Sequence, residues 1–303
     1  MTTEVIDAPF WVRLKSEVTA EEWARILAIL PDLIVAIAAW KGGVGKTELT
    51  KELAFLYDAV LVDLDWDSGG MTRKWGYRHE TRVNAPLLDA IETGRVPRPL
   101  SGGGVRADLV PSHPDFGDNQ PPADQMASHL EKWQSAWSRP VAVDTHPGGL
   151  SSTLGAVSAA RVVVVPVNLE VNMLRGVEQM LEELQGGYPI ILIPNRIESA
   201  PETLVRWLER ISATYKIPVG PPIYNHPYLK TRHKTMAVSA PGRSGLIPRR
   251  HQAFVDEIYN VAKAVILFAA DPNKFASTTS DTAADANVVV GVDDSANTDK
   301  ERV

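Results

Sequence analysis

Short apolar runs, separated by amphipathic stretches with helical spacing, dominate this chain between residues 33 and 270. The runs are rich in valine, isoleucine and leucine, which is typical of strands buried on both faces of a parallel sheet. They lie at residues 33–39, 59–62, 107–111, 140–143, 161–167 and 189–194, and the segment 217–223 is expected to lead to a last strand. Strands that alternate with helices predict the α/β class, with a doubly wound, mostly parallel sheet and helices on both faces.

The predicted helices are placed by apolar residues that recur every three or four positions. They cover residues 20–30, 48–57, 86–93, 125–137, 171–184, 202–215 and 252–269. The first begins after Thr19, because Thr19 and Glu22 have the spacing of a capping box, and Pro31 ends it. Trp133 and Trp137 share one stripe of the helix at 125–137, which indicates core packing.

Composition divides the chain into an N-terminal helical arm at residues 1–32, a core domain at 33–270 and a tail at 271–303. The arm is too short for a helix-turn-helix domain, so nothing in it indicates specific operator binding. The tail lacks hydrophobic periodicity and carries seven acidic residues against three basic ones. We therefore predict that this acidic tail is disordered.

A glycine-rich segment joins the first predicted strand to the helix at 48–57. Residues 40–47 read Trp-Lys-Gly-Gly-Val-Gly-Lys-Thr. Glycines let backbone N–H groups turn inward, the helix N-terminus adds a positive dipole, and Lys46 supplies a point charge for the β- and γ-phosphates. The Thr47 hydroxyl is placed to ligate Mg²⁺. The segment predicts a phosphate-binding loop, or P-loop, made of Gly42, Gly43, Val44, Gly45, Lys46, Thr47 and Glu48.

This P-loop departs from the usual Gly-x-x-x-x-Gly-Lys-Ser/Thr pattern, because Trp40 stands at the first glycine and Lys41 adds a second lysine. Lys-Gly-Gly-Val-Gly-Lys-Thr resembles the deviant loop of the partition and cell-division ATPases, the ParA/MinD family. The resemblance covers roughly residues 33–268 and implies a P-loop NTPase fold with ATP and Mg²⁺ as ligands. It also implies a homodimer formed on ATP binding, in which Lys41 reaches the partner's phosphates.

Two predicted strands end in carboxylates, at the edge where open α/β sheets bind ligands. Asp63 and Asp65 alternate with apolar residues and so share one face, and Asp144 ends the strand at 140–143. A strand that ends in Asp before Gly and Pro is the Walker B arrangement, which assigns Asp144 to Mg²⁺ together with Thr47. The resemblance implies that Asp65 helps to activate the attacking water and that Asp63 lies near the Mg²⁺ shell. Solvated acids at a strand end are the alternative.

The segments around these acids differ from the family pattern. Trp66-Asp67 stands where the family has Pro-Gln, and His146 replaces a proline. His146 could contact the γ-phosphate or a partner subunit, or could simply fill a loop position. After the strand at 189–194, Asn195 begins an Asn-Arg pair that resembles the family's adenine contact, and its amide offers both a donor and an acceptor. A plain turn residue is the alternative for Asn195.

Net charge is −6, so the whole chain is a poor electrostatic match for nucleic acid. However, from Arg210 to Val255 there are eight Lys or Arg and no Asp or Glu. In the partition branch of the family, the corresponding region binds DNA through cations directed at phosphates, without reading sequence. The candidates here are Lys230, Arg232, Lys234, Arg243, Arg249 and Arg250. A solvated surface, or pairing with acids elsewhere, is the alternative.

Composition excludes several other classes. The chain has no cysteine, which rules out a disulfide framework, thiol catalysis and the iron–sulfur relatives that share this loop. The first residues lack a signal-peptide pattern, and no apolar run approaches the length of a membrane span. The acidic tail also differs from the basic amphipathic helix of the membrane-binding cell-division branch. We expect a cytoplasmic, nucleoid-associated protein with no membrane contact.

Together these features predict a ParA-like DNA-partition ATPase whose sandwich dimer binds DNA nonspecifically and hydrolyses ATP slowly, with Lys41, Lys46 and Asp65 as catalytic residues. By the resemblance, a ParB-like centromere-binding protein stimulates hydrolysis and plasmid or chromosome DNA is segregated. The alternatives are an ATPase that positions a protein cluster or organelle, and a small-molecule ATP-dependent ligase or kinase. Glu48 stands where many P-loops have a hydroxyl for the α-phosphate. We therefore expect slow turnover and a dissociation constant for ATP not below about 1 μM.

Overall fold

The computed structural model describes residues 9–67, 70–79, 85–232, 235–242 and 244–273. Within these ranges six strands form one sheet in the order β3-β2-β4-β1-β5-β6, and every neighbouring pair is parallel. The strands are β1 Ile34–Ile37, β2 Val60–Asp63, β3 Asp108–Val110, β4 Val141–Asp144, β5 Val162–Val167 and β6 Ile190–Pro194. The chain thus winds first to one side of β1 and then to the other, which confirms the predicted doubly wound α/β fold.

The strand register aligns the carboxyl ends of β1, β2 and β4. Ile37 of β1 pairs with Asp144 of β4, and Asp144 also pairs with Asp63 of β2. Because the strands are parallel, their carboxyl ends meet at one edge of the sheet. The loop after β1 and the carboxylates of β2 and β4 therefore meet where the strand order reverses, which is where open α/β sheets bind ligands.

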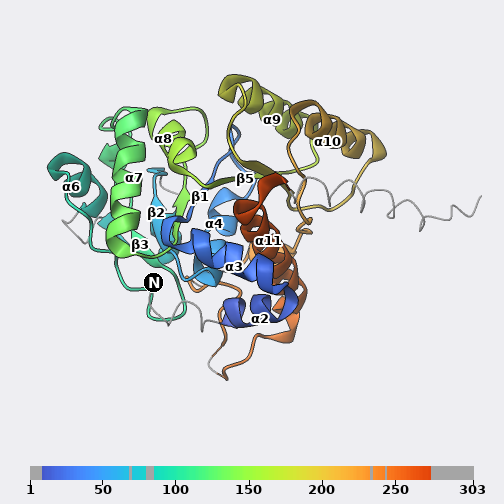
Figure 1. Ribbon diagram of the computed structural model, residues 1–303, viewed down its shortest axis with the longest axis horizontal. Helices are drawn as coiled ribbons and strands as arrows, with labels where there is room; N and C mark the ends of the chain where they lie inside the picture. The colour runs from blue at the N-terminus through green and yellow to red at the C-terminus, as the bar shows by residue number, and fades with distance from the viewer. Residues whose placement is uncertain (1–8, 68–69, 80–84, 233–234, 243, 274–303) are drawn as a thin grey trace, which may run out of the picture.

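Helices cover both faces of the sheet (Figure 1). The α-helices are α2 Pro9–Glu17, α3 Ala20–Ile29, α4 Lys46–Leu56, α5 Met71–Trp75, α6 Pro86–Thr93, α7 Ala123–Trp137, α8 Ser151–Ala159, α9 Val171–Leu184, α10 Glu202–Tyr215 and α11 Gln252–Ala270. Single 3₁₀ turns occur as η1 Leu30–Asp32, η3 Pro114–Phe116, η4 Pro227–Leu229 and η5 Arg249–His251. The predicted bounds of α6, α9 and α10 are confirmed to the residue, whereas the short α5 and α8 were not predicted.

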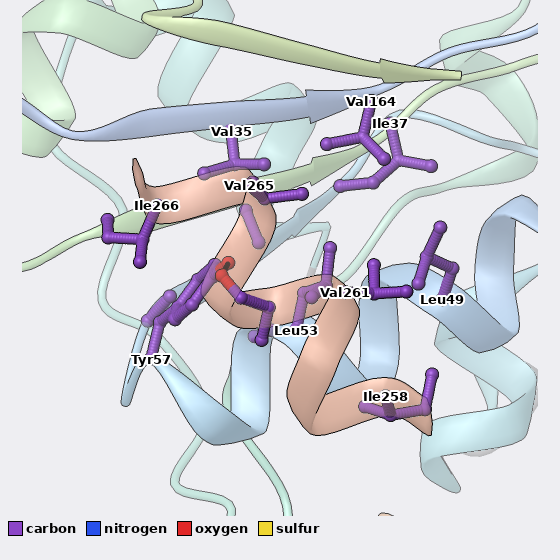
Figure 2. Close-up of a cluster of buried hydrophobic side chains, with 14 of the residues drawn as sticks. Val35, Ile37, Leu49, Leu53, Tyr57, Val164, Ile258, Val261, Val265 and Ile266 are labelled. Atoms are coloured by element: carbon purple, nitrogen blue, oxygen red, sulfur yellow. Dashed lines mark hydrogen bonds between the residues drawn. The ribbon is translucent and has the colours of Figure 1, made fainter. Parts of the chain in front are cut away.

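One face of the sheet packs against α4 and α11, with α3 lying against α11 (Figure 1). Figure 2 shows strand side chains directed toward those of the two helices. The labelled residues are Val35 and Ile37 of β1, Val164 of β5, Leu49, Leu53 and Tyr57 of α4, and Ile258, Val261, Val265 and Ile266 of α11. The same core includes Trp11 and Leu14 of α2, which ties the N-terminal arm to the domain.

The alternate residues of each strand face the second core, on the other side of the sheet. Ile34 and Ala36 of β1 belong to it, together with side chains from α7, α9 and α10. Trp133 is fully buried there, and Trp137 is half-buried and packs against the same core. The predicted core role of this tryptophan stripe is confirmed. Both faces of every central strand are therefore covered, as continuous apolar runs require.

The N-terminal arm is fixed by a helix cap and by contacts with α11. The Thr19 hydroxyl accepts from the Glu22 N–H at 3.2 Å, and the Glu22 carboxylate accepts from the Thr19 N–H at 2.9 Å. This geometry confirms the predicted capping box. Lys263 of α11 donates to the Glu17 carboxylate at 2.9 Å, and this hydrogen bond lowers the pKa of Glu17 to about 2.

One expectation for the C-terminal half was wrong. No strand follows the segment 217–223 within the described residues, where only two isolated bridges form, Leu192 with Val219 and Ile197 with Tyr224. Prolines are the physical reason, because Pro218, Pro221 and Pro222 have no N–H to donate to a ladder. Residues 274–303, most of the predicted tail, lie outside the described residues. None of the helices described combines the length and apolar character needed to cross a bilayer.

Candidate functional site

The predicted P-loop lies at the centre of the carboxyl edge of the sheet. It follows β1 and ends where α4 begins at Lys46. Gly43 and Gly45 have φ angles of +83° and +95°, in the left-handed region that disfavours any residue with a Cβ. Gly45 is also the N-cap residue of α4, so the first, unpaired N–H groups of the helix lie beside the loop. A glycine-rich turn that leads into a helix N-terminus is suited to bind phosphate.

Two side chains after β6 support the P-loop from outside. The Nδ2 of Asn195 donates to the Val44 carbonyl at 2.7 Å, and the Nη1 of Arg196 donates to the Gly43 carbonyl at 2.6 Å. A Cβ at Gly45 would collide with the Asn195 amide. Asn195 therefore lies in the site with its donor committed to the loop, and its predicted adenine contact stays a prediction. The supporting role of Arg196 was not foreseen, because the pairing joins residues far apart in sequence.

Lys46 and Asp144 form the charged centre of the site. Lys46 is 5% exposed, and Asp144 is fully buried. Burial lowers the pKa of Lys46, although the negative charges of Asp144 and Asp65 oppose this effect. Burial likewise raises the pKa of Asp144 to about 6, although the positive charge of Lys46 opposes it. Desolvation thus disfavours the charged form of both groups, and a bound ligand of opposite charge would offset this cost.

The residues around Asp144 fit a magnesium ion. Its Oδ1 accepts from the Thr50 hydroxyl at 3.1 Å, and the Thr47 hydroxyl also bonds to its side chain. Its Oδ2 is buried and has no hydrogen-bond partner among the described residues. Carboxylate and hydroxyl oxygens are the ligands that Mg²⁺ prefers. Thr47 and Asp144 are therefore the groups that would hold the ion.

Asp63 and Asp65, expected to share one role, have different surroundings. Asp63 is fully buried, and its Oδ1 accepts from the Asp65 N–H at 3.0 Å. Its Oδ2 accepts from the Thr72 N–H at 2.6 Å and the Thr72 hydroxyl at 2.5 Å. One Asp63 oxygen thus holds the start of α5 and the other accepts from the backbone after β2, and the predicted Mg²⁺ role of Asp63 stays a prediction. Asp65 is half-buried and lies at the cavity in front of the P-loop.

This cavity, which we call the loop cavity, has a volume of about 580 Å³. It extends from the P-loop to an apolar part formed by Ile223, Leu229, Phe254 and Ile258. Among the described residues, eight Lys or Arg line it against two acids, Glu48 and Asp65. The cations are Lys46, Lys51, Arg73, Lys74, Arg78, Arg196, Lys230 and Arg232. In a chain of net charge −6, this electropositive cavity is suited to a polyanion such as a nucleoside triphosphate.

Glu48 does not oppose an anion as strongly as its place in the P-loop suggested. Its carboxylate forms an ion pair with Lys51, one turn along α4. Burial by itself would raise the pKa of Glu48, but Lys51, Lys74 and Arg232 together lower it. Its charge is therefore compensated by neighbouring cations. The expected slow turnover and modest ATP affinity stay predictions.

The two residues that make the P-loop unusual are both anchored on α9. The aliphatic chain of Lys41 lies against Gly176, where an added Cβ would come within 2.5 Å of the Lys41 Cγ. The indole N–H of Trp40 donates to the carboxylate of Glu183. Lys41 is exposed and does not line the loop cavity of its own chain. Its predicted contact with a partner's phosphates stays a prediction.

The described members of the basic stretch that was predicted to bind DNA lie in two different places. Lys230 and Arg232 line the loop cavity, and Arg232 donates to the carbonyls of Met236 and Ala237 at 2.8 and 3.2 Å. Arg249 and Arg250 are exposed in η5. Lys234 and Arg243 lie outside the described residues. The stretch thus contributes to the cavity wall as well as to an exposed basic pair, and a DNA role for any of its members stays a prediction.

Three further cavity cations, Arg73, Lys74 and Arg78, were not identified from the sequence. They belong to α5 and the turn after it, and no motif surrounds them. They reach the cavity because Asp63 fixes the start of α5 beside the end of β2. The remaining departures from the family pattern, Trp66, Asp67 and His146, lie together beside Asp65, as described below.

No known family profile matches the chain. The chromosome-partitioning ATPase Soj of Thermus thermophilus is 36% identical over 157 residues, which make up 50% of this chain and 61% of Soj. The match therefore spans about three fifths of that relative's length.

Solved structures share the fold over most of the chain. Apo McdA of Cyanothece superposes with a TM-score of 0.62 at 17% identity, over 77% of this chain and 99% of McdA. The cell division protein MinD of Aquifex aeolicus gives 0.56 at 23% identity, over 76% and 95%. Cobyrinic acid a,c-diamide synthase of Mycobacterium smegmatis, with a bound ATP analogue and magnesium, gives 0.60 at 22% identity, over 80% and 97%. At these identities the likeness shows a shared fold.

Proposed function

We propose, on the premise that this chain belongs to the ParA/MinD family of P-loop ATPases, that it is a DNA-partition ATPase. In this proposal ATP with Mg²⁺ binds in the loop cavity, two ATP-loaded chains associate face to face, and the dimer binds DNA without sequence preference. A ParB-like centromere-binding protein stimulates slow hydrolysis, which releases the dimer from DNA. The protein then works in the cytoplasm, on the nucleoid.

The observation that carries this proposal is the combination of P-loop and charge in the loop cavity. The P-loop glycines, the N-terminus of α4 and the buried Lys46 lie together at one end of a cavity lined mostly by cations. The unpartnered Asp144 oxygen and the Thr47 hydroxyl supply the oxygen ligands that an accompanying Mg²⁺ needs. Bound Mg²⁺ would neutralise phosphate charge and fix the phosphates for in-line attack.

The residues of this chain supply the remaining requirements for hydrolysis. Lys46 is placed to stabilise charge on the transferring phosphoryl group from within the chain. Asp65 is half-buried at the cavity, and burial raises its pKa, which suits a carboxylate that accepts a hydrogen bond from water. Lys41 packs against α9, is exposed and does not line the loop cavity of its own chain, so it is available to reach the phosphates of a second chain.

DNA binding is assigned to the exposed pair Arg249 and Arg250. Phosphate contacts need accessible cations, and these two arginines are exposed in η5, directly before α11. Lys230 and Arg232 line the loop cavity and are expected to act on the bound nucleotide first. Dimerisation would place two exposed pairs on one assembly, which would make DNA binding depend on ATP.

The test is binding of the full chain to a nonspecific DNA duplex in the presence of ATP, ADP or no nucleotide. We expect binding that requires ATP, weakens steeply as salt rises, and is lost in the double variant Arg249→Ala/Arg250→Ala. The matched control is Arg95→Ala/Arg98→Ala, which removes two exposed arginines after α6. The control variant should bind DNA like the wild type.

The outcomes separate the candidate functions. If both double variants lose binding equally, general charge is responsible and the assignment to η5 is wrong. If no nucleotide state binds DNA while ATP still drives dimerisation, the protein is an ATPase that positions a protein cargo. If ATP neither binds nor changes the oligomeric state, the proposed function fails as a whole.

A further inference from the structure

Three residues that set this chain apart from the ParA/MinD pattern converge on one place in the structure. Trp66 and Asp67 follow β2, whereas His146 follows β4, 79 positions after Asp67 in the sequence. The His146 ring stacks on the Trp66 indole with centroids 4.0 Å apart and an interplanar angle of 5°. Asp65 and Asp67 lie next to this stacked pair. The departures therefore form one structural unit.

The geometry of this unit suits a metal ion. One ligand atom each from Asp65, Asp67 and His146 lies within 4.8 Å of the other two. The Nε2 of His146 is 3.4 Å from the Oδ2 of Asp67. Two ligands on a tetrahedral ion with metal–ligand bonds of about 2.1 Å have this separation. The half-buried Asp65 supplies the third ligand atom, within the same 4.8 Å.

The His146 ring is held with its outer nitrogen facing the carboxylates. Its Nδ1 lies 2.8 Å from the Pro147 carbonyl and is the nitrogen that donates to it. The proton is thereby placed on Nδ1, and in the neutral ring the lone pair of Nε2 faces Asp67. Metal-binding histidines typically make such a second hydrogen bond, which orients the ring and fixes the tautomer.

Trp66, which orients His146, has a closely fitted position of its own. The ring of Phe116 meets the indole edge to face at 5.8 Å. A Cβ added to Gly117 would come within 2.8 Å of the Trp66 Nε1. The ring stack is therefore packed from two sides. An ion at His146 would find a preorganised ligand, not a side chain that must first be ordered.

A second cavity, of about 310 Å³, borders Asp65 and Asp67. Ser112 lines it, is 2% exposed, and its hydroxyl has no hydrogen-bond partner among the described residues. A buried hydroxyl without a partner is available to bind a group such as an ion-bound water in this cavity. Asp67 is 67% exposed, which leaves an entry path for an ion. Arg73 also lines this cavity, so its lining is mixed in charge.

We propose that Asp65, Asp67 and His146 bind a divalent first-row transition-metal ion, at a site separate from the Mg²⁺ position of Thr47 and Asp144. The imidazole ligand decides the class of ion, since Zn²⁺, Fe²⁺, Co²⁺ and Ni²⁺ accept nitrogen whereas Mg²⁺ prefers oxygen. The ion joins the loop after β2 to the loop after β4. It also takes one ligand, Asp65, from the wall of the loop cavity.

The test is Co²⁺ and Zn²⁺ binding to the full, nucleotide-free chain, with Co²⁺ absorption reporting the coordination geometry. We expect one ion per chain, a spectrum with nitrogen and oxygen ligands, and no displacement by a hundredfold excess of Mg²⁺. His146→Asn and Asp67→Asn should each weaken binding at least tenfold. Asp67 is exposed, so Asp67→Asn tests the site even if the histidine variant does not fold.

Two matched controls distinguish this site from its neighbours. His113, which lines the same cavity, forms a similar pair with Asp115, with Nδ1 and Oδ2 3.6 Å apart, but does not belong to the cluster of Asp65, Asp67 and His146. His113→Asn should leave the affinity unchanged, and so should Asp144→Asn. Loss of binding in either control, equal binding in all variants, or no binding at millimolar ion would overturn the proposal. The assay contains no nucleotide, so its result is independent of the proposed ATPase function.

Discussion

Two cavities meet at Asp65 and differ in the ligands that their walls can attract. Among the residues that the structure describes, eight cations and two acids line the loop cavity, and Lys46 is buried there. In the same described part of the chain, the second cavity has Asp65, Asp67 and the nearby His146, with Arg73 as its one Lys or Arg. One lining suits a polyanion and the other a metal cation, although Asp65 and Arg73 line both cavities. The comparison indicates that the elements around these shared residues set the charge of each cavity.

The difference originates in how the two cavities are built. In the loop cavity the charges come from the P-loop, α4, α5 and the segment after η4, which are far apart in sequence. In the second cavity the ligand atoms come from two short loops at the ends of β2 and β4. Because β2 and β4 are neighbours in register, these loops are close whatever the rest of the chain does.

The largest effect is expected from Lys46→Ala. The variant removes the buried cation of the loop cavity and leaves Asp144 and Asp65 without its charge, so ATP affinity should fall about 100-fold or more. Metal binding at Asp65, Asp67 and His146 should not weaken, because the variant removes a positive charge near Asp65. Calorimetric titration with ATP–Mg²⁺ and with Co²⁺ measures both. Lys41→Ala, which removes the exposed lysine, is the control and should bind ATP within about threefold of wild type while losing dimerisation. Equal loss of ATP binding in both variants would contradict the distinction between the two lysines.

A second large effect is expected on stability, from Asp144→Asn. The folded-state pKa of Asp144, about 6, lies above its ordinary value of 3.8, so the native state binds the proton more tightly than the unfolded state. Wild-type stability relative to the variant should therefore fall as pH rises from about 4 to about 6, by up to about 3 kcal/mol. Urea unfolding of both proteins from pH 4.5 to 7.5 measures this. Asp67→Asn, at an exposed carboxylate, should show no such pH dependence. A wild type that gains stability over Asp144→Asn across this interval would exclude the cause given.

These two variants also show how far sequence reasoning could go. The P-loop, Asp144 and all six strands could be predicted, because each depends on a local pattern: a glycine spacing, a strand end or an apolar run. Contacts between side chains that are far apart in the sequence could not be predicted in this way. Asp63 and Asp65 have similar sequence surroundings, but Thr72, nine residues after Asp63, donates two hydrogen bonds to one oxygen of Asp63. The cations of α5 reach the loop cavity because of that contact, so they too escaped prediction.

The same limit applies to the basic stretch and to Glu48. Counting charges from Arg210 to Val255 identified the cations but not the surface that each side chain faces. In the structure, part of this stretch lines the loop cavity. Glu48 was judged by its place in the motif, whereas its charge is set by Lys51, Lys74 and Arg232 around it. Three interpretations of His146 stayed open, because nothing in the sequence showed that Trp66 would stack on it.

An intermediate effect is expected from Asn195→Ala, which tests the support of the P-loop. The change leaves the Val44 carbonyl without its donor and should lower the free energy of unfolding by about 1–3 kcal/mol. ATP affinity should fall as well, whereas metal affinity in the second cavity should not. Denaturant unfolding and ATP titration measure the two effects.

Gly45→Ala gives an internal check on this support. Its Cβ would collide with the Asn195 amide and its φ of +95° would be strained. The double variant Gly45→Ala/Asn195→Ala should therefore be less destabilised than the sum of the single variants, because the collision is removed while the backbone strain stays. Strict additivity would mean that Asn195 does not contact the loop at Gly45.

The smallest effect is expected from Glu48→Gln, although its position in the P-loop suggests a large one. The carboxylate is paired with Lys51 and surrounded by Lys74 and Arg232, so neutralising it adds little to a cavity that already holds eight cations. ATP affinity should rise less than about threefold, which is under 1 kcal/mol. Lys51→Met is the matched variant, because it leaves Glu48 charged and unpaired, and it should weaken ATP binding more than Glu48→Gln strengthens it. A tenfold or larger gain from Glu48→Gln would show that the acid faces the phosphates directly, and the loop cavity would then be less uniformly suited to anions than its contrast with the second cavity implies.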